Sequence, residues 1–205
     1  YVGAIAATLV GTSFDGLSAW VHVPLVMLAG ALAGAAWAGI AGFLKVRFQA
    51  SEIVTTIMLN YIAIILTSYL VTGPMKDASA AYPQSARLVR EAWTPRIVSD
   101  MRLHIGILVA VVLAVALYIF LQKSSRGFAL RVVGVNPNAA RYAGMNVGRN
   151  VMIAICISGA LAGLAGAFEV AGVTHRLYQN ISPGYGFEGI AVALLANNNP
   201  LAAII

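Results

Sequence analysis

Four stretches of this sequence are long, apolar and almost free of charge, and they limit the possible folds more than any other feature. They are residues 23–44, 53–71, 103–121 and 151–172. A helix needs roughly 20 residues, each rising about 1.5 Å, to cross a hydrocarbon core of about 30 Å. The first two stretches carry no charged residue, the third holds only His104, and the fourth holds only Glu169. These stretches therefore predict membrane-spanning helices.

The overall composition agrees with a membrane protein. Hydrophobic residues make up 60% of the chain and charged residues 10%, against roughly 45–50% and about 25% in soluble domains. The sequence starts at Tyr1 and is largely apolar at both ends. We therefore expect a fragment of a larger hydrophobic protein, truncated at both ends and without a readable targeting peptide.

The expected fold is an all-α membrane protein, a polytopic transmembrane helix bundle that forms one domain over residues 1–205. Its spans are predicted at about residues 1–10 (partial), 23–44, 53–71, 103–121, 151–172 and 190–205 (broken or partial). Three asparagines and Pro200 interrupt the last of these spans. Such an interruption predicts a broken or re-entrant segment near residues 182–200.

The distribution of basic residues predicts an orientation. Loops 45–52 and 122–150 lie on the same side of the membrane if the long stretches all cross it. Their basic residues, accompanied only by Glu52, are Lys45, Arg47, Lys123, Arg126, Arg131, Arg141 and Arg149. Basic residues on the other side are diluted by several acids. Cytoplasmic loops are enriched in Lys and Arg, so we place loop 122–150 in the cytoplasm. We therefore interpret the net charge of +6 as an interaction of the basic loops with anionic lipid and not with nucleic acid.

Enzymatic signatures are missing from the sequence. There is no phosphate-binding G-x-x-x-x-G-K-[ST] loop, and the three histidines have no recognisable nucleophile or metal-ligand pattern around them. The single cysteine, Cys156, lies in an apolar stretch. We expect a chain that is not an enzyme and that holds no cofactor or metal ion.

A few polar and small residues stand out inside the apolar stretches. Asn60, followed by Tyr61, lies mid-span and needs a hydrogen-bonding partner, either in another helix or in a ligand. A carboxylate such as Glu169 faces a cavity, a partner or the interfacial water. Gly30 and Gly34 are four residues apart, as are Gly159 and Gly163, and this spacing permits close helix contact.

Turn-forming residues divide loop 122–150 into short helical pieces. Residues 128–133 are predicted to form about one helical turn. A second short helix is predicted over residues 138–142, with Asn136 or Asn138 as its cap and Gly144 as its stop. From these residues alone, a solvated connecting loop remains the alternative.

Several segments resemble one family of transport proteins. GFALRVVGVNPNAARYAGMNV (127–147) is similar to the cytoplasmic coupling segment of permeases from ABC importers for ribose, nucleosides and branched-chain amino acids. The segments ISGALAGLAGAFEVAGVTHRL (157–177) and SPGYGFEGIAVALL (182–195) resemble the parts that follow it. SEIVTTIMLNYIA (51–63) is closest to the nucleoside and simple-sugar branch. One departure is Ala196, where the family pattern has glycine.

The resemblance implies a set of partners. In that family two permease subunits pair as a homodimer or heterodimer, two ABC ATP-binding subunits bind ATP and Mg, and an extracytoplasmic solute-binding protein or lipoprotein delivers solute. The implied ATPase contact consists of Asn138, Ala139, Ala140, Arg141 and Gly144. The candidate substrate path consists of Asn60, Tyr61, Glu169, Tyr185 and Glu188.

The leading hypothesis is a multi-pass permease subunit in the lipid bilayer of a bacterial cytoplasmic membrane. It would import a nucleoside-like or simple-sugar solute by alternating access, powered by a separate ATPase. The alternatives are an ion-coupled secondary transporter, a branched-chain amino acid permease and a membrane scaffold or receptor. A secondary transporter should show paired intramembrane carboxylates or histidines, and Glu169 is the single carboxylate in the apolar stretches.

Overall fold

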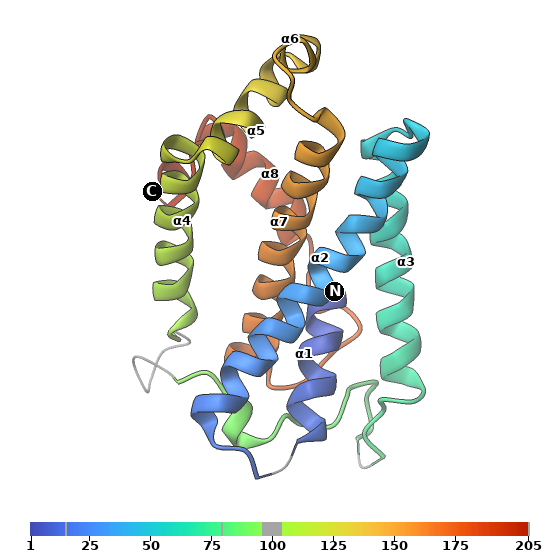
Figure 1. Ribbon diagram of the computed structural model, residues 1–205. Coiled ribbons are helices and arrows are strands. Elements are labelled where there is room, and N and C mark those ends of the chain that lie inside the picture. The colour runs from blue at the N-terminus through green and yellow to red at the C-terminus, as the bar shows by residue number, and fades with distance from the viewer. Residues whose placement is uncertain (15, 79, 96–103, 205) are drawn as a thin grey trace. The chain divides into compact units, whose positions relative to one another are not determined.

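The computed structural model describes residues 1–14, 16–78, 80–95 and 104–204. Within these ranges the regular structure is entirely helical, as predicted (Figure 1). The elements are α1 Val2–Ser13, α2 Ala19–Phe48, α3 Glu52–Thr72, η1 Arg90–Ala92, α4 Gly106–Lys123, α5 Ser125–Val135, α6 Pro137–Tyr142, α7 Val147–Phe168, η2 Glu169–Thr174, α8 Tyr185–Leu195 and η3 Ala202–Ile204. Among the described residues, four helical segments are long and apolar enough to cross a membrane: α2, α3, α4 and the continuous stretch Val147–Thr174.

The chain forms two compact units. The first comprises Tyr1–His104 and Ile155–Ile181, and the second comprises Ile105–Ala154 and Ser182–Ile205. α7 therefore begins in the second unit and continues into the first.

The long helices extend beyond the apolar stretches that predict them. α2 begins at Ala19 and continues to Phe48, past Lys45 and Arg47. These two cations stand in its last turn, where they are favoured by the negative end of the helix dipole. The helix stops at Gln49, whose left-handed backbone (φ 54°) lets its N–H donate to the Leu44 carbonyl. The expected third span starts at Leu103, which lies outside the described residues, and α4 begins at Gly106.

Glycines hold α1, α2 and α7 together in the first unit. A Cβ added to Gly34 would overlap the carbonyl oxygen of Gly159, and one added to Gly163 would overlap that of Gly30. A Cβ on Gly3 would overlap the backbone of Gly163. The helix backbones thus touch where the sequence predicts close contact. Small residues are the usual means of such approach in membranes, because lipid supplies no hydrophobic drive between helices.

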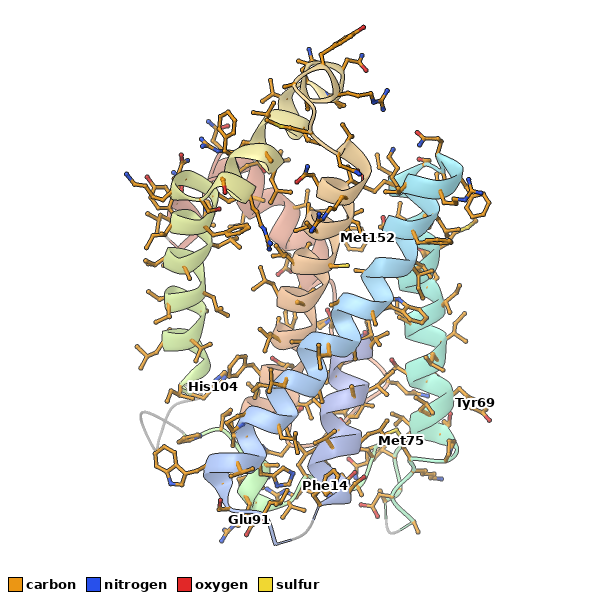
Figure 2. All side chains as sticks on the ribbon, in the orientation of Figure 1. Phe14, Tyr69, Met75, Glu91, His104 and Met152 are labelled. Atoms are coloured by element: carbon orange, nitrogen blue, oxygen red, sulfur yellow. The ribbon has the colours of Figure 1, made fainter. Side chains whose placement is uncertain are left out.

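A strap, residues 80–95, is bound to the end of α7 and η2. The Leu88 N–H donates to the His175 carbonyl (3.0 Å), and the Thr94 N–H donates to the Ala171 carbonyl (3.1 Å). Ser85 and Leu177 exchange two further bonds, of 3.0 and 2.9 Å. Leu88 of the strap belongs to the buried apolar cluster of this unit, which also includes Val26, Val71, Val170 and Leu177. Figure 2 shows Phe14, Met75 and Glu91 gathered at this end of the first unit.

An ion pair joins Asp77, which precedes the strap, to Arg176, which follows η2. Arg176 donates to the carboxylate of Asp77 at 2.9 Å. Both side chains are about one-fifth to one-quarter exposed (19% and 25%), so solvent weakens the pair, and we assign it a positioning role.

The second unit contains the interrupted C-terminal segment. α8 begins at Tyr185, five residues before the expected start at Ile190, and ends at Leu195. Asn197 and Asn198 then adopt left-handed backbones with φ of 51° and 57°. Asparagine tolerates this region better than most residues. The asparagines therefore break the helix as their sequence predicts.

Candidate functional site

A cavity of about 220 Å³ lies in the first unit among α1, α2, α3 and α7. Its lining residues are Tyr1, Val2, Gly3, Gly34, Trp37, Ala38, Ala41, Thr56, Leu59, Asn60, Ala63, Gly159, Ala162 and Gly163. Most are small, because the same glycines and alanines that let the helices touch leave room beside the contact. No side chain in this lining carries a charge.

Two polar groups of the cavity lining lack hydrogen-bonding partners. The indole Nε1 of Trp37 is buried and has no acceptor among the described residues. Asn60 is half-buried, and none of the hydrogen bonds among the described residues involves its side chain. Thr56 differs, since its hydroxyl donates to the Glu52 carbonyl at 2.9 Å. Buried polar groups in proteins are almost always paired, so the cavity presents unused hydrogen-bonding capacity.

The other candidates for the substrate path lie elsewhere. Tyr61 follows Asn60 on α3 but is 63% exposed and does not line the cavity. Glu169, half-buried, opens η2, where the Thr174 hydroxyl donates to its carbonyl at 3.2 Å. Tyr185 and Glu188 belong to the second unit, and both are exposed on α8. Of the candidates in the first unit, the structure brings only Asn60 into the cavity.

Glu169 occupies an unusual stretch of backbone. η2 is a π-helical segment, wider than an α-helix, and the residue that follows its end, His175, has a φ of 54°. Such segments occur frequently at functional sites. The sequence carried no signal for it that we could identify.

Trp37, whose buried indole N–H lacks an acceptor among the described residues, was not predicted as a site residue from the sequence. Its depth in the α2–α3 hairpin can nevertheless be worked out from residue spacing. Trp37 and Asn60 stand at comparable distances along their helices from the turn that begins at Gln49. At about 1.5 Å per residue the two side chains reach similar depths. An indole and an amide at one depth in facing helices are a usable signal for a polar site.

A second candidate site is the coupling hairpin, which we define as α5 and α6. α5 is longer than the single turn predicted for residues 128–133, because Ser124 caps it by accepting from the Gly127 N–H at 2.9 Å. α6 is capped by Asn136, whose Oδ1 accepts from the N–H groups of Asn138 (3.0 Å) and Ala139 (3.1 Å). Asn136 is one of the two caps that the sequence predicts.

The end of α6 is also well defined. Gly144 has a φ of 78°. Its N–H donates to Arg141 at 3.0 Å, and the Met145 N–H donates to Ala140 at 2.9 Å. This pair of bonds is a Schellman motif, which satisfies carbonyls that the last helical turn leaves open. The predicted stop at Gly144 is thus present.

The exposed face of the coupling hairpin differs from the expected ATPase contact in one residue. Ala140 is fully buried within its own chain, so it cannot supply the close approach to a partner expected of it. Asn138, Ala139 and Arg141 are exposed. Two large side chains of the coupling hairpin that were not predicted are also exposed, since Val135 is 88% exposed and Tyr142 is 94% exposed.

Potential metal ligands do not cluster in the part of the chain that the structure describes. No group of three or more His, Cys, Asp or Glu side chains there is arranged to hold an ion. The candidate sites are therefore a neutral cavity and a surface hairpin.

Comparison with known proteins gives consistent matches over the whole chain. The family model described as the permease component of branched-chain amino acid transport systems matches residues 1–205. A guanosine ABC transporter permease from Bacillus subtilis is 43% identical over 208 residues, covering 100% of this chain and 59% of that protein. A glucose ABC transporter permease from Haloferax volcanii is 38% identical, covering 97% of this chain and 54% of that protein.

A third relative adds to this pattern. A nucleoside ABC transporter permease from Lactococcus lactis is 31% identical, covering 98% of this chain and 58% of that protein. The chain thus spans little more than half the length of these relatives. No solved structure matches it.

Proposed function

We propose that this chain, which belongs to the family of permease components of branched-chain amino acid transport systems, is part of the membrane-spanning subunit of an ATP-driven importer. The solute is a nucleoside or a simple sugar, and it crosses a cell membrane by alternating access. The observation that carries the proposal is the 43% identity to a guanosine permease over the full chain. The helices that can span a membrane and the capped coupling hairpin support it.

The proposed complex has several partners. Two permease subunits pair, two ATP-binding subunits dock on the cytoplasmic side and hold ATP and Mg, and an extracytoplasmic solute-binding protein or lipoprotein delivers the solute. ATP hydrolysis then belongs to the partner ATPase. The coupling hairpin supports this assignment, because its Val135 and Tyr142 side chains are almost fully exposed and available to a partner.

Reconstitution tests the proposed function. The complete permease, its ATPase and its binding protein are placed in proteoliposomes, and ATP hydrolysis is measured with adenosine, glucose and leucine. We expect adenosine or glucose to stimulate hydrolysis and leucine to have no effect. Stimulation by leucine alone would assign the protein to amino acid transport. Uptake driven by an ion gradient without ATP would instead establish a secondary transporter.

The orientation makes a further prediction. In a variant with Cys156 replaced by serine, single cysteines are introduced at Ser125 on α5 or at Tyr82 in the strap, both exposed positions. Because basic residues dominate loop 122–150, the cysteine at Ser125 should react with a membrane-impermeant maleimide only after the cells are permeabilised. The cysteine at Tyr82 should react in intact cells. The reverse labelling pattern would contradict the orientation.

A further inference from the structure

We infer that the cavity lined by Trp37 and Asn60 binds the base ring of the solute, with the indole N–H and the side-chain amide as its hydrogen-bonding groups. This inference rests on the proposed function and specifies which part of the solute the first unit recognises. Its starting point is the pair of unused polar groups in one small cavity.

The unpaired indole is the first step. Trp37 Nε1 is buried without an acceptor, on a helix whose surroundings are apolar. Water is scarce at the depth of a spanning helix, so a donor there is satisfied by protein or by a ligand. The described residues supply no acceptor, and a ring nitrogen or carbonyl of a solute would do so. Asn60 adds a donor and an acceptor from α3.

The absence of charged side chains from the cavity lining narrows the class of ligand. None of the lining side chains is ionised. A charged group bound in this cavity would lose its hydration without gaining an oppositely charged partner, which is unfavourable. The cavity therefore does not accommodate a phosphate group or the zwitterionic part of an amino acid such as leucine. The cavity fits a neutral group with hydrogen-bonding atoms on its edge.

The shape of that edge favours a base over a sugar. A side-chain amide presents its acceptor and its donors in one plane, and this pairs with a base edge that carries a donor beside an acceptor, as Asn does with adenine. Sugar hydroxyls also bond to amides, but they are not arranged in one plane. The volume of about 220 Å³ is below the roughly 300–1,000 Å³ of cavities for drug-sized ligands. It accommodates one ring system and not a complete nucleoside.

Two conservative substitutions in the complete permease complex test this inference. Trp37→Phe keeps an aromatic ring and removes the N–H, and Asn60→Leu keeps a similar volume and removes the amide. Each should raise the adenosine concentration for half-maximal ATPase stimulation about tenfold, the effect of losing one buried hydrogen bond. Free adenine should compete with adenosine in the wild-type complex, and ribose should not.

Matched controls lie on the same helices. Trp20→Phe changes a 92% exposed tryptophan on α2, and Met58→Leu changes a 63% exposed side chain on α3. Neither residue lines the cavity, and both variants should keep the wild-type half-maximal concentration. If Trp37→Phe and Asn60→Leu also keep it while the wild-type complex transports adenosine, the inference is wrong and the proposed function stands. A wild-type complex that responds to no nucleoside or sugar disproves the proposed function itself.

A labelling experiment covers the case in which either cavity variant fails to fold. Ala162 lines the cavity, whereas Ala165, on the same helix, is exposed but does not line it. With Cys156 replaced by serine, adenine should slow alkylation of a cysteine at Ala162 and leave a cysteine at Ala165 unaffected. Equal rates with and without adenine at Ala162, or protection by ribose alone, would overturn the assignment to the base.

Discussion

Alanine in place of Gly163 is expected to prevent α2 and α7 from packing and to lower sharply the yield of folded protein. The added Cβ would overlap the Gly30 carbonyl oxygen and lie 3.0 Å from the Gly34 Cα. These are backbone atoms, which cannot rotate away as a side chain can. Overpacking of a tight interior costs about 1–3 kcal/mol and occasionally more. The midpoint of thermal unfolding of the purified permease measures the effect.

Gly134 provides the matched control for this substitution. It lies in α5, and a Cβ added there meets no atom within 4 Å. Gly134→Ala should therefore leave the midpoint unchanged or raise it, since alanine in a helix is favoured over glycine by roughly 0.5–1 kcal/mol. If Gly163→Ala unfolded at the same temperature as Gly134→Ala, the close contact between α2 and α7 would be incorrect.

Valine in place of Gly144 is expected to abolish most solute-stimulated ATP hydrolysis while the permease still inserts in the membrane. No atom stands within 4 Å of the added Cβ, so the cause is not a clash with neighbouring groups. The φ of 78° is a region that β-branched residues almost never adopt. The end of α6 must then rearrange, and with it the surface offered to the ATPase. We expect at least a tenfold loss of stimulated turnover.

Gly144→Asn tests that explanation, because asparagine enters the left-handed region more readily than valine. This variant should recover much of the stimulated turnover. Ala139→Asp, on the exposed face of α6, should reduce ATPase assembly without loss of inserted protein. Ala140→Asp is a poorer test of docking, since Ala140 is buried and a carboxylate there would disrupt the coupling hairpin itself. Wild-type turnover in both Gly144→Val and Ala139→Asp would show that this hairpin is only a connector.

The sequence predicted the features that depend on residues close together along the chain. Apolar length predicted the spanning helices, and the glycine pairs predicted where helices touch. Asn136 and Gly144 predicted the cap and stop of α6, because these preferences follow from local backbone geometry. The asparagines before Pro200 predicted the break after α8. The fold class was therefore predictable in full.

Features that depend on tertiary packing were not predicted. Trp37 reaches the cavity only because α2 and α3 turn back at Gln49, and its unpaired N–H is a property of the assembled helices. Ala140 and Ala139 have the same chemistry, yet one is buried and the other exposed, a difference that depends on the folded surroundings and not on residue type.

Asn136 has a consequence for how motion passes through the coupling hairpin. Its N–H closes the last turn of α5 by donating to Val132 at 3.0 Å, and its Oδ1 opens α6 at the same residue. Asn146 similarly caps the start of α7 by accepting from the Arg149 N–H at 2.9 Å. Because the same residue ends α5 and begins α6, there is no flexible linker between the two helices. We therefore expect a displacement of α6 to move α5 with it.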